Sequence, residues 1–154
     1  MEIDKFKGQY DFLSNFYVHP FMFNGIIYQS VEHAYQAYKA TTLADHDKVA
    51  HCDTPAQAKG MGKSITKYEL FDLNKITLMR NLVYEKFAQS SELRKALFNT
   101  GRDELIEGNY WNDRFWGVCN GEGINHLGKI LMWVRYTLKL TEPKDNVRDI
   151  NWRI

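Results

Sequence analysis

Apolar and polar positions near the N-terminus form short runs rather than a helical repeat. The runs 21–23 (Phe-Met-Phe) and 26–28 (Ile-Ile-Tyr) flank Asn24-Gly25. An Asn-Gly pair supplies the positive φ angles that a type I′ turn needs, so two strands joined by a two-residue turn are expected here. The N-terminal part of the chain is therefore predicted to contain a β-hairpin.

From Ser30 onward the apolar positions are spaced by three and four residues, which is typical of helices. Ser30 is the expected N-cap of a helix over 31–41, because a serine hydroxyl accepts a hydrogen bond from a free backbone amide at a helix start. The apolar stripe of this helix comprises Val31, Ala34, Tyr35 and Tyr38.

The rest of the chain continues the helical repeat. Helices are predicted over 43–52, from Pro55 to the glycines at 60–62, after an Asp72 cap, after Ser90 or Ser91 up to Gly101, and from Asn125 to about Leu138. A short strand is expected at 105–106. The pattern indicates an α+β fold class, with a helix-rich single domain over 1–140, a small N-terminal β-sheet, and a polar C-terminal tail over 141–154.

Composition narrows the class of protein. The chain has 154 residues, of which 44% are hydrophobic and 25% charged, and its formal net charge is +1. This balance gives no support for a nucleic-acid coat or a membrane-surface protein, which usually carry a basic surplus. No apolar run reaches the ~20 residues of a membrane helix, and the first ten residues do not resemble a secretory signal. With two cysteines, Cys52 and Cys119, the simplest interpretation is a cytoplasmic protein with reduced thiols and no membrane association.

Three polar side chains on the first predicted helix form a candidate site. Glu32, Gln36 and Lys39 recur at i, i+4 and i+7, so they share one helix face beside the apolar stripe. A carboxylate, an amide and an amine would then converge on one wall of a cleft. The alternative is a solvated face with weak charge pairing, which is the commoner arrangement on surface helices.

The segment 109–117 crowds aromatic residues around Asn112 and Asp113. Such a loop either folds back over the core or stacks on a flat ligand. After it, Gly121 and Gly123 lead into Asn125 at the start of the last helix. Bare backbone amides beside a helix N-terminus favour an anion such as phosphate, although a plain helix-entry turn would give the same pattern.

Metal ligation is not expected. His46, His51 and Cys52 are close in sequence, but their spacing matches no standard zinc pattern. Cys119 is more consistent with a buried, inert thiol than with a nucleophile.

Five motifs, in order along the chain, resemble those of the NADAR superfamily, which includes the YbiA-type riboflavin-intermediate N-glycosidases. They are residues 12–16 (its F-x-S-N-F), 30–39 (S-E-H-x-x-Q-A-x-K), 58–63 (A-x-x-x-G-R/K), 112–117 (N-D-x-x-W-G) and 125–132 (N-x-L-G-x-x-L-M). YbiA-type members carry a tryptophan shortly after the glycine turn, whereas the region 67–72 has none here, and Phe71 or Tyr68 is the candidate to replace it.

The resemblance implies hydrolysis of the bond between ribose C1 and a nitrogen, without a metal or organic cofactor. The expected partner is a small nucleotide or ribosylamine phosphate: an early riboflavin intermediate, or ADP-ribose attached to guanine, in which case ADP-ribosylated DNA or RNA is a further possible target. A non-catalytic module that binds ADP-ribose is the alternative from another class of protein.

The resemblance also assigns site residues. Glu32, Lys39 and Asp113 are the expected catalytic groups, with Lys39 as a Schiff-base nucleophile, Glu32 as proton shuttle and Asp113 orienting a ribose hydroxyl. A direct route through an oxocarbenium-like centre, using Glu32 and Asp113, is the alternative. Phosphates are expected on the amides of 121–125 and on Lys63. The expected substrate-binding residues are Asn15, Phe16, Tyr35, Gln36, Gly62, Lys63, Trp116, Gly117, Gly121, Gly123 and Asn125.

Overall fold

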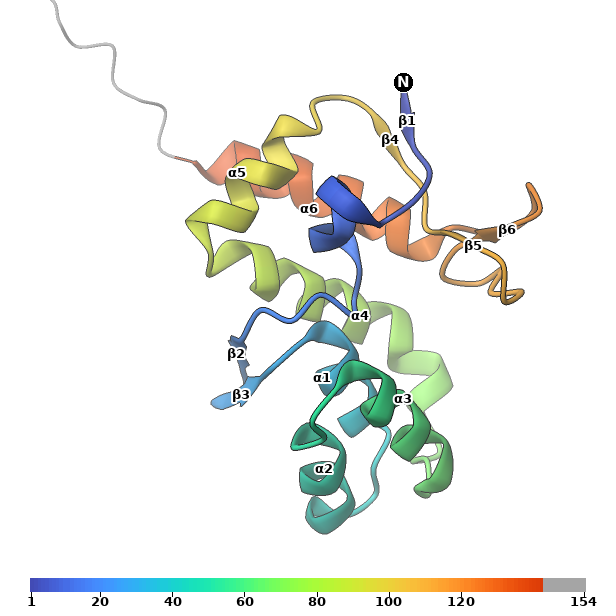
Figure 1. The fold of residues 1–154 in the computed structure, drawn as a ribbon. Helices are drawn as coiled ribbons and strands as arrows, with labels where there is room; N and C mark the ends of the chain where they lie inside the picture. The colour runs from blue at the N-terminus through green and yellow to red at the C-terminus, as the bar shows by residue number, and fades with distance from the viewer. Residues whose placement is uncertain (143–154) are drawn as a thin grey trace, which may run out of the picture.

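The structure is a computed structural model that describes residues 1–142. Helices dominate it, and the strands are short (Figure 1). The helices are α1 (Val31–Ala37), α2 (Leu43–Ala50), α3 (Pro55–Ser64), α4 (Phe71–Ala88), α5 (Ser91–Asn99) and α6 (His126–Thr141), with a 3-10 helix η1 at Gly8–Leu13. The strands are β1 (Glu2–Ile3), β2 (Phe21–Phe23), β3 (Ile26–Tyr28), β4 (Glu104–Leu105), β5 (Gly108–Asn109) and β6 (Val118–Cys119). The α+β fold class predicted from the sequence is confirmed.

The predicted hairpin is present as β2 and β3, which pair in antiparallel register with Phe21 opposite Tyr28. Asn24 and Gly25 have φ angles of 49° and 80°, as a type I′ turn requires. Gln89, at the end of α4, donates to the Met22 carbonyl over 2.6 Å and accepts from its amide over 2.8 Å. The long helix thus holds the strand edge in place.

The other strands form two separate parallel ladders. β1 pairs with β4, so the chain's start lies beside residues 104–105, and β5 pairs with β6. The short strand predicted at 105–106 is β4, shifted by one residue. These ladders deliver the segment 107–117 to the same side of the molecule as the start of α6 (Figure 1).

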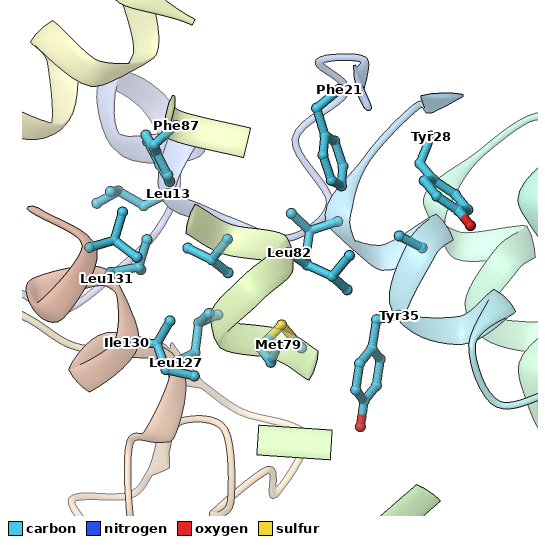
Figure 2. Packing of buried hydrophobic residues seen from close by; sticks show 14 of the residues in the cluster. Leu13, Phe21, Tyr28, Tyr35, Met79, Leu82, Phe87, Leu127, Ile130 and Leu131 are labelled. Carbon is cyan, nitrogen blue, oxygen red and sulfur yellow. The ribbon is translucent and has the colours of Figure 1, made fainter. Parts of the chain in front are cut away.

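The core surrounds α4, which packs against α1, α5, α6 and β2. Figure 2 shows Met79, Leu82 and Phe87 of α4 lying between the apolar face of α6 on one side and Phe21, Tyr28 and Tyr35 on the other. Leu82 and Leu131 are fully buried, and each side chain of this kind contributes about 1.5–3 kcal/mol to the free energy of unfolding. α2 and α3 pack against α1.

Two predicted helix ends are wrong. The first helix was expected to continue to Thr41 but ends at Ala37, because the Lys39 carbonyl accepts from the Tyr68 amide over 2.9 Å and Ala40 bridges Lys67. These contacts pull the chain out of helical geometry. α3 was expected to stop at the glycines and instead continues to Ser64.

The predicted Asp72 cap is also wrong. α4 begins at Phe71, one residue earlier, and has no side-chain cap. Asp72 lies in the first turn, and its carboxylate pairs with Lys67 Nζ at 2.6 Å and Lys75 Nζ at 3.6 Å. In contrast, the Ser90 hydroxyl caps α5 as expected.

Within residues 1–142, no helix combines the length and the apolar character needed to span a membrane. The predicted tail begins at residue 141, and its part from residue 143 onward lies outside the described residues.

Candidate active site

Helix α1 is buried on all sides, which decides between the two interpretations of its polar row. Glu32 and Gln36 are only 6% and 4% exposed, so a solvated face is wrong. The helix is fixed by its cap, because the Ser30 hydroxyl accepts from the His33 amide over 3.2 Å. His33 in turn bonds through Nε2 to the Cys52 carbonyl at 2.9 Å.

The polar row opens into a cleft of about 290 Å³. Its walls come from segments far apart in sequence, namely residues 14–16, α1 and the turn after it, α3, α4, the segment 107–116 and the start of α6. The cleft is lined by Ser14, Asn15, Phe16, Glu32, Tyr35, Gln36, Lys39, Lys59, Met79, Glu107, Trp111, Asp113, Trp116 and Leu127. All three predicted catalytic residues therefore lie on one cleft, together with the expected binding residues Asn15, Phe16, Tyr35, Gln36 and Trp116.

The Glu32 carboxyl is held from inside the protein. Gln36 Nε2 donates to Glu32 Oε1 over 2.8 Å. Burial raises the pKa of Glu32, while the Gln36 hydrogen bond and the ammonium groups of Lys59 and Lys39 lower it. Behind Gln36 lies Gly62, where a Cβ would meet Gln36 Oε1 at 2.0 Å. Gly62 does not line the cleft; it makes room for the amide that holds Glu32.

Lys39 lies in the turn after α1, not on the helix itself. Its Nζ is 5.4 Å from the ring centroid of Tyr35 and 5.7 Å from that of Phe71. Burial lowers the pKa of the Lys39 ammonium, and Glu32 opposes that shift. Phe71 is 1% exposed and its ring packs against that of Tyr35. It therefore contacts Lys39 from the core and does not line the cleft.

Asp113 is fixed by the loop that carries it. Asn109 Oδ1 accepts from the Asp113 amide over 3.0 Å, and Asn109 Nδ2 donates to the Asp113 carbonyl over 2.8 Å. Asp113 Oδ1 accepts from the amides of Phe115 and Trp116 at 3.0 and 2.8 Å. The Trp116 ring packs edge-on against Tyr35, with 5.6 Å between ring centroids. This loop both anchors itself on the core and forms a wall of the cleft.

Two charged residues of the cleft were missed from the sequence. Lys59 precedes Gly62 by three residues, which places it on the same face of α3, and its Nζ lies 5.7 Å from the Phe16 ring and 5.9 Å from the Trp111 ring. Glu107 begins the glycine- and aromatic-rich segment. Burial raises its pKa to about 7, the Asn109 hydrogen bond opposes this, and Asp113 adds to it. No local spacing connects Glu107 to Glu32.

The structure does not bring the predicted phosphate-binding residues to the cleft. Gly121, Gly123, Asn125 and Lys63 do not line the cleft. Of the amides at 121–125, those of Glu122, Ile124 and Asn125 donate to the carbonyls of Cys119, Arg114 and Gly117. Pairing within the folded chain thus occupies part of these donors.

Two other predicted binding residues, Asn125 and Gly117, contact the segment that carries Glu107, and a third, Gly121, lies in a separate groove. The Asn125 side chain accepts from the Glu107 amide and donates to the Leu105 carbonyl, both over 3.0 Å. A Cβ on Gly117 would meet Glu107 Oε2 at 1.9 Å. Gly121 lies in a different groove of about 860 Å³, which shares Trp111 with the cleft.

Comparison with known proteins points in the same direction as the geometry. The chain is 36% identical to an N-glycosidase of Nostoc punctiforme over 136 residues, which cover 84% of this chain and 86% of that protein. It is 31% identical to the N-glycosidase YbiA of Escherichia coli over 87% of this chain and 85% of that protein. A riboflavin biosynthesis protein of Vibrio vulnificus is 36% identical, and there the match spans 39% of the longer protein.

The fold agrees as well. The solution structure of Escherichia coli YbiA superposes with a TM-score of 0.81 at 29% identity, covering 95% of this chain and 93% of that one. These relatives support the N-glycosyl hydrolase activity predicted from the sequence. The family model described as the NADAR domain matches residues 4–139, and the chain therefore belongs to the NADAR domain family.

Proposed function

We propose that the chain hydrolyses the bond between ribose C1 and nitrogen in phosphorylated N-ribosyl compounds through a Schiff base on Lys39. The proposed substrates are early riboflavin-pathway ribosylamino-pyrimidines or ADP-ribosylated guanine. One observation carries the proposal: a half-buried lysine with a lowered pKa faces the same cleft as the buried carboxyl of Glu32. Burial favours the neutral amine, which is the nucleophilic form.

The reaction begins with ring opening. The lone pair of the substrate nitrogen forms a C1=N double bond, and the C1–O4′ bond breaks. The neutral amine of Lys39 then adds to C1. Glu32 accepts a proton from the lysine nitrogen and passes it to the substrate nitrogen, so that the C1–N bond breaks and the amine or base departs. Water hydrolyses the protonated Schiff base that remains on Lys39.

Other residues of the cleft suit the rest of the substrate. Asp113 can accept a hydrogen bond from a ribose hydroxyl, since its position is fixed by Asn109. Lys59 is the second cation that lines the cleft and takes the place of Lys63 as the expected phosphate contact. Its ammonium group lies 5.7 Å from the Phe16 ring and 5.9 Å from the Trp111 ring, and these partly exposed rings can stack on a base.

Borohydride trapping tests the proposal. Borohydride reduces a Schiff base to a stable amine, so treatment during turnover should add the sugar-phosphate mass to the peptide that contains Lys39. Lys39→Arg keeps the charge but supplies no neutral amine, and should abolish both adduct and turnover. Lys63→Arg, outside the cleft, is the matched control and should behave as wild type.

The outcomes separate three chemistries. Turnover retained by Lys39→Arg would contradict a covalent role and favour the direct route through Glu32 and Asp113. Parallel assays on a ribosylamino-pyrimidine phosphate and on ADP-ribosyl-guanosine would identify the substrate class. Tight binding of both compounds without release of base or sugar would instead mean a binding module.

A further inference from the structure

A second, half-buried carboxyl group lies in the cleft, and the steps above leave it without a role. Glu107 lines the cleft beside Glu32, Asp113 and Lys59. Asn109 Nδ2 donates to Glu107 Oε2 over 3.2 Å. On its other side the bare Cα of Gly117 approaches so closely that a Cβ there would lie 1.9 Å from the same oxygen. The carboxyl is thus held in one position.

The backbone of Glu107 is equally constrained. Its amide donates to Asn125 Oδ1 over 3.0 Å, and its carbonyl accepts from the Val118 amide over 2.8 Å. The Glu107 backbone is therefore hydrogen-bonded to the residue that precedes α6 and to β6, and it lies two residues after the end of β4. Such rigidity is expected of a group that must meet a reacting atom in a fixed geometry.

The surroundings of Glu107 favour its protonated form near neutral pH. Burial raises the pKa to about 7, and the nearby carboxylates of Asp113 and Glu32 also raise it, while the Asn109 hydrogen bond and Lys59 oppose the shift. A carboxylic acid that titrates near the working pH is well suited to donate a proton.

Ring opening requires such a donor. When the C1–O4′ bond breaks, its electron pair stays on O4′, which needs a proton to become a hydroxyl. Glu32 does not serve this step, because it carries a proton between Lys39 and the departing nitrogen. The reaction thus needs a second acid in the same cleft.

We propose that Glu107 is a further catalytic residue, the acid that protonates the ribose ring oxygen O4′ as the ring opens. This inference rests on the proposed Schiff-base function. The step leaves Glu107 as a carboxylate and the substrate as an iminium ion. Hydrolysis of the later Schiff base by water releases one proton, which returns Glu107 to its acid form. The freed sugar recloses as a hemiacetal with no net change in protons.

Glu107→Gln removes the acid while keeping the side-chain size and an oxygen that can accept from Asn109. It should lower turnover of an N-ribosyl substrate by about a hundred- to ten-thousand-fold, the range for loss of a general acid. Glu122→Gln is the matched control, because Glu122 is an exposed carboxylate of the neighbouring turn that pairs with Arg114 at 2.7 Å. It should retain wild-type turnover.

Trapping with two different sugars isolates the ring-opening step. An N-ribosyl substrate must be opened by the enzyme, whereas the hemiacetal of ribose 5-phosphate opens to its free aldehyde spontaneously in solution. With borohydride, Glu107→Gln should lose the Lys39 adduct from the substrate but keep the adduct from ribose 5-phosphate. Lys39→Arg should lose both.

Each outcome bears on a different claim. Wild-type turnover and substrate trapping in Glu107→Gln, or equal loss of both adducts, would overturn the acid role of Glu107 while Lys39 keeps its own. A wild-type enzyme that turns over but traps neither sugar would overturn the Schiff base and this inference together. The wild-type pH profile gives a check that needs no variant: kcat should fall as pH rises through about 7, and a flat profile there would contradict the proposal.

Discussion

At the scale of single residues, the protonation of Glu32 is a balance of opposing effects. Burial favours the neutral carboxyl, whereas the Gln36 hydrogen bond and two ammonium groups favour the carboxylate. Burial is the largest of these effects and the net result is a raised pKa, so the Glu32 carboxylate takes up a proton more readily than an exposed one and can accept it from one nitrogen and pass it to another. A proton shuttle needs this property.

Glu32→Gln should lower kcat by about a hundred- to ten-thousand-fold, because an amide cannot carry the proton. The melting temperature should stay close to wild type, since glutamine has the same shape and still accepts from Gln36. Saturating kinetics and thermal melting, measured beside the exposed control Glu92→Gln, check both statements. A variant that melts like wild type and turns over normally would remove Glu32 from the mechanism.

At the scale of secondary-structure elements, the contact between α3 and α1 depends on one glycine. α3 contains both Gly60 and Gly62. A Cβ on Gly60 meets nothing within 4 Å, whereas one on Gly62 would lie 2.0 Å from Gln36 Oε1. Gln36 donates a hydrogen bond to Glu32. The packing at Gly62 therefore affects the position of Glu32, although Gly62 itself does not line the cleft.

The two glycines give a matched pair of variants. Gly60→Ala should stabilise the protein by about 0.5–1 kcal/mol through helix propensity and leave activity unchanged. Gly62→Ala should instead displace Gln36 and lower kcat. Denaturant unfolding and turnover assays on both variants test this, and equal behaviour of the pair would show that the tight approach at Gly62 has no consequence for the site.

How far the sequence could predict these elements depended on whether the signal was local. The Asn24-Gly25 turn and the Ser30 and Ser90 caps involve neighbours in sequence, and all three are confirmed. The predicted phosphate-binding residues do not line the cleft, because long-range pairing, such as that of the Ile124 and Asn125 amides with the Arg114 and Gly117 carbonyls, decides where this segment lies. Glu107 was missed for the same reason, since only the folded chain brings it to Glu32.

At the scale of the whole molecule, a buried lysine connects the core to the cleft. Lys86 of α4 is 2% exposed, and its Nζ donates to the carbonyls of Phe12 at 2.7 Å and Ser14 at 3.0 Å. Those carbonyls precede Asn15 and Phe16, so the lysine fixes the segment that forms one cleft wall. Burial lowers the pKa of Lys86 to about 7, and Asp11 opposes the shift.

This burial predicts how stability depends on pH. Between pH 7 and about 10 the unfolded chain keeps the Lys86 proton while a growing share of folded chains has lost it. Raising the pH therefore favours the folded state, by at most about 1.4 kcal/mol per pH unit. Urea unfolding from pH 7 to 9 should show this rise in wild type and in the exposed control Lys95→Met, and a flatter dependence in Lys86→Met. Identical slopes in all three would mean that Lys86 stays charged in the fold.

The half-burial of Lys39 against Tyr35 and Phe71 also governs when this chain becomes reactive. In an unfolded or nascent chain the same lysine has an ordinary pKa and is almost entirely protonated at neutral pH, and a protonated amine does not condense with aldehydes. The neutral, nucleophilic fraction of Lys39 therefore increases when folding places Phe71 against the turn after α1. Before folding, reducing sugars thus meet a Lys39 that is no more reactive than any other exposed lysine, and its reactivity rises only together with the cleft that selects its substrate.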